Sequence, residues 1–109
     1  MVKSRCELIT KYLLPALRAL IAAKLVSKYN LTQIEAAKKM GTTQAAISYY
    51  LNSKRGAKAI ALLEKDTEIM KDIERIVELM NKGSTNIQLG DVLCKLCKRI
   101  NEKGLLNQI

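Results

Sequence analysis

Residues 31–56 read LTQIEAAKKMGTTQAAISYYLNSKRG, and this stretch predicts two short helices joined by a tight turn. Thr32 is followed three residues later by Glu35, which is the capping-box pattern that starts a helix. Gly41 ends that helix, because glycine adopts a positive φ that other residues resist. The two threonines after the glycine are candidate caps for the second helix, so the stretch predicts a compact pair of helices.

This helix pair fits the helix-turn-helix unit, in which a turn of three or four residues containing glycine joins two helices. The second helix begins after Thr42 or Thr43 and runs to about Asn52. Ala37 is small where the two helices cross, and Ile47 packs back between them. The side of the second helix that faces away from Ile47 is therefore polar and exposed.

The rest of the chain also predicts helices. Phe and Trp are absent, so aliphatic side chains fill the core, which suits helix packing. We expect helices over about residues 3–13, 15–29, 57–79 and 89–103. Pro15 fits the first turn of the second of these, although it can either separate two helices or kink one. The third has a break near Asp66.

An apolar stripe in the second half of the chain is compatible with two kinds of packing. Its members are spaced four, three and four residues apart, as in a coiled-coil seam: Ile69, Ile73, Ile76 and Met80. The stripe either packs on its own domain or forms a dimer interface. It spans about two heptads, which is too short to separate these alternatives.

The formal net charge of +9 is concentrated in the first half of the chain. Residues 1–58 carry eleven Lys and Arg against two acidic residues, whereas residues 59–109 carry eight of each sign. Such a one-sided surplus attracts a polyanion, and nucleic acid is the common one. A solvated basic face kept for solubility is the alternative that charge alone leaves open.

Residues 31–56 resemble the helix-turn-helix of the phage-repressor-like (XRE/Cro-like) transcriptional regulators. The wider pattern is similar to a group of archaeal regulators, through CELITKYLLPALRALIAAKLVSKYN at 6–30 and LCKLCKRI at 93–100. In that group a domain related to thiamine phosphate synthase sometimes follows the DNA-binding part, but this sequence stops at Ile109, so we expect no effector domain. The resemblance implies an all-α chain with a DNA-binding domain over residues 1–62 and a helical extension over 63–109.

A recognition helix of this type presents its first residues to base edges in the major groove. Gln44 is the best candidate for base reading, because a primary amide pairs bidentately with adenine N6 and N7. The base-edge candidates are Thr43, Gln44, Ser48, Tyr49 and Asn52. The phosphate candidates are Gln33, Lys38, Lys54, Arg55 and Lys58. For each of them the alternative is a solvated polar side chain.

The three cysteines leave three alternatives open. Cys94 and Cys97 form a C-x-x-C pattern, and Cys6 stands alone near the start. They are buried free thiols, or Cys6 forms a disulfide with Cys94 or Cys97, or they bind a metal or iron–sulfur cluster shared between subunits. A zinc site normally needs four ligands and the sequence has no histidine, so no metal or cofactor is assigned.

We expect a transcriptional regulator that binds double-stranded DNA sequence-specifically as a homodimer in the cytoplasm, at the nucleoid. A symmetric pair is expected because one short helix reads too few bases. The alternative is a small basic archaeal chromatin protein with little sequence preference. An enzyme is not expected, because the sequence has no histidine and no phosphate-binding glycine loop. The apolar stretch 12–26 is too short to span a bilayer and contains two cationic residues.

Overall fold

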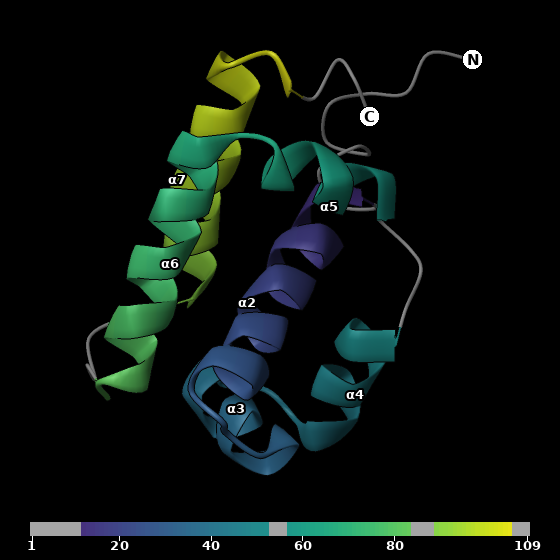
Figure 1. Ribbon diagram of the computed structural model, residues 1–109, viewed down its shortest axis with the longest axis vertical. Helices are drawn as coiled ribbons and strands as arrows, with labels where there is room; N and C mark the ends of the chain where they lie inside the picture. The colour runs from purple at the N-terminus through teal and green to yellow at the C-terminus, as the bar shows by residue number, and fades with distance from the viewer. Residues whose placement is uncertain (1–11, 53–56, 84–88, 106–109) are drawn as a thin grey trace.

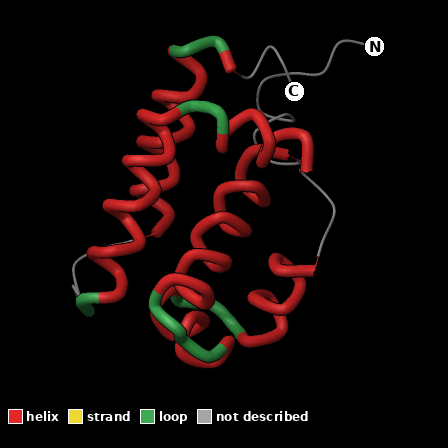
Figure 2. The backbone as a smooth tube through the Cα atoms, viewed as in Figure 1, coloured by secondary structure: helices red, strands yellow, loops and turns green. Residues whose placement is uncertain are grey.

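The computed structural model describes residues 12–52, 57–83 and 89–105, and every structural statement below concerns these ranges. Six helices and no strand occur in them (Figure 2), so the predicted all-α class is confirmed. The helices are α2 (Leu14–Lys28), α3 (Gln33–Met40), α4 (Gln44–Asn52), α5 (Ala57–Glu64), α6 (Thr67–Asn81) and α7 (Leu89–Glu102). The helix expected over 3–13 lies almost entirely outside the described residues.

Helix α2 is the central element of the fold. It lies between the α6–α7 pair and the α3–α4 pair, and it packs against every other helix (Figure 1). Pro15 occupies its first turn, as predicted, where the missing proline N–H breaks no helical hydrogen bond. Leu17, Ile21 and Leu25 are fully buried along it. Apolar burial of this kind is the main stabilising force of such a core.

The first helix of the pair begins and ends as the sequence predicts. The Thr32 hydroxyl oxygen accepts from the Glu35 N–H at 3.1 Å, and the Glu35 carboxylate accepts from the Thr32 N–H at 3.1 Å. Both halves of the capping box are therefore present. Gly41 adopts a φ of +69° at the end of α3, and the N–H of Thr42 then donates to the Ala37 carbonyl at 2.9 Å. This tight turn redirects the chain into α4.

The start of α4 decides between the two candidate caps. The Thr43 hydroxyl oxygen accepts from the Ala46 N–H at 3.2 Å, so Thr43 is the capping residue. Ile47 is fully buried, and α4 packs on both α2 and α3. By contrast, Ile34 on α3 is 53% exposed. Both helices contribute to the core, α4 through Ile47 and α3 through Ala36, Ala37 and Met40.

The expected break near Asp66 is present between α5 and α6. The Asp66 carboxylate accepts from the Ile69 N–H at 3.1 Å and caps α6. The four members of the apolar stripe are buried within this single chain: Ile69, Ile73, Ile76 and Met80. Since α6 packs on α2, the structure shows the intrachain alternative for this stripe.

Helix α7 packs on α6 through an apolar face and through ion pairs. Leu93, Leu96 and Ile100 are buried on the apolar face. Arg99 contacts Asp72 at 2.6 Å and Glu68 at 3.1 Å across the α6–α7 boundary. Exposed pairs of this kind stabilise weakly, so we assign most of the packing energy to the apolar face.

Candidate DNA-binding site

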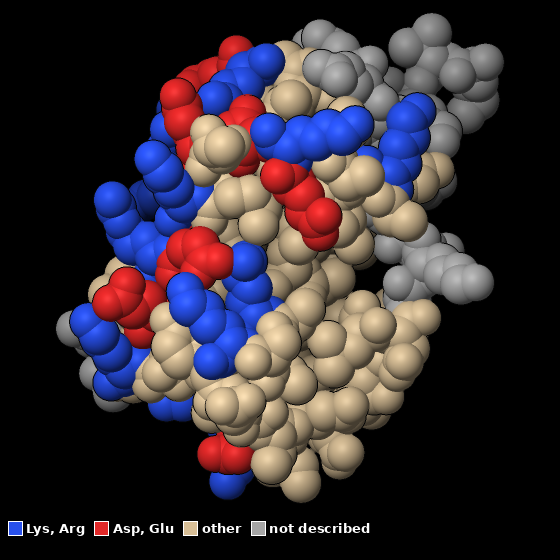
Figure 3. Space-filling model, viewed as in Figure 1, with Lys and Arg blue, Asp and Glu red and all other residues tan. Residues whose placement is uncertain are grey.

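The outer face of α4 is polar and uncharged. Gln44 and Tyr49 are exposed, Tyr49 by 53%, and Ser48 is partly exposed. No residue of α4 carries a charge, and the surface over this helix is correspondingly tan in Figure 3. The fold thus brings the predicted base-edge candidates to the surface on one short helix, with hydrogen-bonding groups and no fixed charge.

Three of the base-edge candidates, Thr43, Ser48 and Asn52, already make side-chain hydrogen bonds within the helix pair. The Asn52 amide nitrogen donates to the Ser48 carbonyl at 2.8 Å and lies 3.4 Å from the Ser48 hydroxyl oxygen. Thr43 is exposed, but its hydroxyl oxygen caps α4. Neither the side-chain carbonyl oxygen of Asn52 nor the methyl group of Thr43 takes part in these hydrogen bonds. Both groups can therefore contact DNA without breaking one.

The two tyrosines at the end of α4 differ in their surroundings. Their rings meet edge to face, with centroids 6.2 Å apart and planes inclined at 68°. Tyr50 is partly buried and packs against the core, whereas Tyr49 is exposed. The Tyr50 ring therefore supports the orientation of the Tyr49 ring at the surface.

The phosphate candidates lie at the ends of neighbouring helices. Gln33 is the first residue of α3 and is partly exposed, at a helix end that favours anions. Lys38 is exposed in the last turn of α3, and Lys58 is exposed in the first turn of α5. Lys54 and Arg55 lie outside the described residues.

Part of the basic surplus is used inside the protein. Lys24 and Lys28 on α2 both bind the Glu74 carboxylate on α6, at 2.5 and 2.6 Å. Lys39 donates to the Asn81 carbonyl at 3.1 Å and so connects α3 to the end of α6. The charge count assigned these three lysines to the basic half of the chain, residues 1–58, which is expected to attract a polyanion. In the structure all three contact residues of the other half, 59–109.

The Glu74 ion pairs predict a specific dependence of folding stability on pH. Hydrogen bonds from Lys24 and then Lys28 lower the pKa of the Glu74 carboxyl from 4.5. A lowered pKa means that folding favours the charged form, so this stability is present above about pH 4.5 and lost as the pH falls through the folded pKa. Glu74→Gln should therefore reduce the difference between urea midpoints measured at neutral and acidic pH.

A matched control uses Glu102, an exposed carboxylate that has no ion pair within the described residues. Glu102→Gln should keep the wild-type dependence of the urea midpoint on pH. If Glu74→Gln and Glu102→Gln gave the same acid sensitivity as the wild-type protein, the Glu74 pairs would contribute nothing to stability.

The cysteines do not form the candidate disulfide in this structure. Cys94 is an exposed free thiol, Cys97 is a buried free thiol, and Cys6 lies outside the described residues. Desolvation, followed by the nearby Cys94, raises the pKa of the Cys97 thiol to about 11, although Arg18 opposes this. The buried-thiol alternative fits Cys97 but not Cys94. Ion pairs and apolar packing hold α7 in place without a covalent link.

Comparison with known protein families locates the same unit that the geometry shows. Residues 21–65 match the helix-turn-helix family. The match runs from α2 through α3 and α4 to the end of α5, and it supports DNA binding through this unit. No curated protein and no solved structure matches the chain. None of the helices in the described ranges combines the length and the apolar character needed to cross a membrane.

Proposed function

We propose that this protein binds double-stranded DNA sequence-specifically through its helix-turn-helix and regulates transcription without being an enzyme. The observation that carries this is the exposed, uncharged polar face of α4, on a helix held in place by the buried Ile47. A helix of this kind fits the major groove, where polar side chains distinguish base pairs. The same proposal includes two further points. The protein is related to archaeal regulators, and it acts at the nucleoid in the cytoplasm.

Gln44 is the residue to which we assign base reading. It is exposed as the first residue of α4, the end of a recognition helix that enters the groove. Its amide can pair bidentately with adenine N6 and N7. Ser48, Tyr49 and Asn52 lie further along the same helix and serve base edges or phosphates there.

Phosphate contacts come from the ends of the neighbouring helices. Gln33 offers both its side chain and the N-terminus of α3 to one phosphate. Lys38 and Lys58 are exposed cations that can follow the backbone. We assign the same role to Lys54 and Arg55, which follow α4 in the sequence and lie outside the described residues. Such contacts set affinity and orientation, and base contacts set sequence preference.

A homodimer is the form that we propose on DNA. A single recognition helix reads too few base pairs to find one site in a genome. Two copies related by symmetry, with recognition helices about 34 Å apart, would read a palindromic site. A palindromic consensus from sequence selection, bound by two copies in sedimentation measurements, would support this arrangement. A non-repeated half-site bound by one copy would contradict it.

Two glutamines in equivalent places allow a matched test of base reading. Gln44 begins α4 and Gln33 begins α3, so the same change to alanine can be compared at both helix starts. On a selected site, Gln44→Ala should cost about 1–3 kcal/mol, or roughly fivefold to 150-fold in Kd, and should leave binding to random DNA unchanged. Gln33→Ala should instead weaken binding to the selected duplex and to random duplexes by the same factor. Fluorescence anisotropy at fixed salt measures both.

The alternative of a chromatin protein makes a different prediction for the same experiment. Selected and random duplexes would then bind with nearly equal affinity, and neither substitution would change their ratio. An equal loss on selected and random DNA in Gln44→Ala would likewise remove the base-reading role from Gln44.

A further inference from the structure

A pocket lies beside the helix-turn-helix and is separate from the outer face of α4. It has a volume of about 380 Å³ and is lined by Arg18, Met40, Gly41, Thr42 and Tyr50. We call it the turn pocket. Arg18 belongs to α2, Gly41 and Thr42 form the turn, and Tyr50 lies near the end of α4. The pocket therefore joins three segments whose relative positions define the helix pair.

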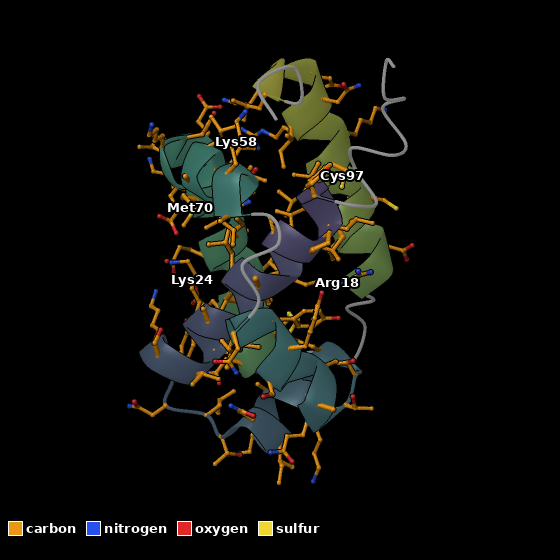
Figure 4. All side chains as sticks on the ribbon, turned by 90° about the vertical axis from the view of Figure 1, so that its right-hand side faces the viewer. Arg18, Lys24, Lys58, Met70 and Cys97 are labelled. Carbon is orange, nitrogen blue, oxygen red and sulfur yellow. The ribbon has the colours of Figure 1, made fainter. Side chains whose placement is uncertain are left out.

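Arg18 gives this pocket a positive charge that the rest of the described structure does not neutralise. No carboxylate in the described ranges forms an ion pair with Arg18, although Lys24 on the same helix is paired with Glu74. Figure 4 shows these two cations on opposite sides of α2. Arg18 is also only partly exposed, so water screens its charge less than that of a free surface lysine.

One candidate counter-ion among the described residues is a thiol that stays neutral. Cys97 of α7 is close enough for Arg18 to influence its ionisation, and both labels lie on the same side of α2 in Figure 4. Burial nevertheless raises the pKa of the Cys97 thiol to about 11, so at neutral pH it carries no negative charge. Since the described residues offer no charged partner, an anion from solution is the candidate that would balance the guanidinium.

We propose that the turn pocket binds a phosphate group, with the Arg18 guanidinium and the hydroxyls of Thr42 and Tyr50 as donors. The guanidinium presents parallel N–H groups that match two oxygens of a phosphate. The two hydroxyls lining the pocket supply further donors for a third oxygen, which a carboxylate does not have. This donor set is why a phosphate fits better than a carboxylate.

The phosphate has two sources with the same chemistry. One is a small phosphorylated molecule, for which a pocket of about 380 Å³ is large enough. The other is a backbone phosphate of the DNA duplex, and this source rests on the proposed function. In both cases the bound group would connect α2 to the turn and to α4, which restrains the recognition helix.

The first arm of the test uses inorganic phosphate and no DNA. Sodium phosphate is added to the full ¹⁵N-labelled chain at constant ionic strength, and the amide shifts of Gly41, Thr42 and Tyr50 are followed. We expect saturable shifts at these residues and at least tenfold weaker binding in Arg18→Met. Arg18→Lys should bind with intermediate affinity, because lysine keeps the charge but lacks the parallel N–H groups of the guanidinium. Lys71→Met removes an exposed cation of α6, to which no phosphate or DNA contact is assigned, and should bind as the wild-type protein does.

The second arm uses a 20-base-pair duplex and separates the two sources. If only the duplex shifts these amides, and Arg18→Met lowers the salt slope by about one unit per subunit, the phosphate is that of DNA. Thermal unfolding of both Arg18 variants controls for folding. The inference is overturned if neither ligand shifts the three amides saturably, or if Arg18→Met binds phosphate as the wild-type protein does. A duplex that binds without involving Arg18, together with no phosphate binding, would overturn this inference and leave the proposed function intact.

Discussion

Replacement of Ile47 by alanine should lower the free energy of unfolding by about 2–5 kcal/mol. Ile47 is fully buried at the contact of α4 with α2 and α3. The change removes three carbons from a close-packed site and leaves a cavity that neighbouring helices fill only in part. Urea unfolding followed by circular dichroism measures the loss. Because α4 has no other fully buried residue, the same variant should also lose DNA affinity.

Ile34 provides a control with the same residue type and the same change. It lies on α3 and is 53% exposed, so Ile34→Ala should alter the free energy of unfolding by about 0.5 kcal/mol or less. Equal losses in Ile34→Ala and Ile47→Ala would mean that Ile47 does not hold the helix pair together.

The comparison of these two isoleucines also shows what the sequence could predict. The helix starts at Thr32 and Thr43, the turn at Gly41 and the break near Asp66 follow from local signals, because each depends on residues within one turn of the chain. Ile34 and Ile47 are both apolar residues of short helices, yet Ile34 is 53% exposed and Ile47 is fully buried. Periodicity indicates a face of a helix, but only the packed helices determine whether that face is covered.

The site was less predictable where it depends on contacts distant in sequence. Glu74 binds Lys24 and Lys28 from 50 and 46 residues away, and no local pattern indicates this pairing. The charge count treated both lysines as part of the surplus that attracts DNA. No local pattern indicates a pocket at Arg18, because the turn pocket forms only when α2, the turn and α4 come together.

Affinity for duplex DNA should fall by roughly 10³–10⁵ between 50 and 200 mM salt, if a dimer neutralises 6 to 10 phosphates. Each cation that binds a phosphate releases counterions from DNA, so the logarithm of the affinity falls linearly with the logarithm of salt concentration. The slope, measured by fluorescence anisotropy on random duplexes, then gives the number of phosphates that are neutralised. A slope near zero would contradict the proposed polyanion partner.

The structure predicts which lysines determine that slope. Lys38 and Lys58 are exposed and have no ion pair within the described ranges, so Lys38→Gln and Lys58→Gln should each lower it by about one unit per bound subunit. Lys24→Gln and Lys28→Gln should change it less, because both cations are already held by the Glu74 carboxylate in the free protein. Lys24→Gln and Lys28→Gln could instead lower the salt slope as much as Lys38→Gln and Lys58→Gln do. In that case Lys24 and Lys28 would have to leave Glu74 and bind DNA. The duplex would then contact the α2–α6 side of the molecule, and the assignment of α4 as the recognition helix would be wrong.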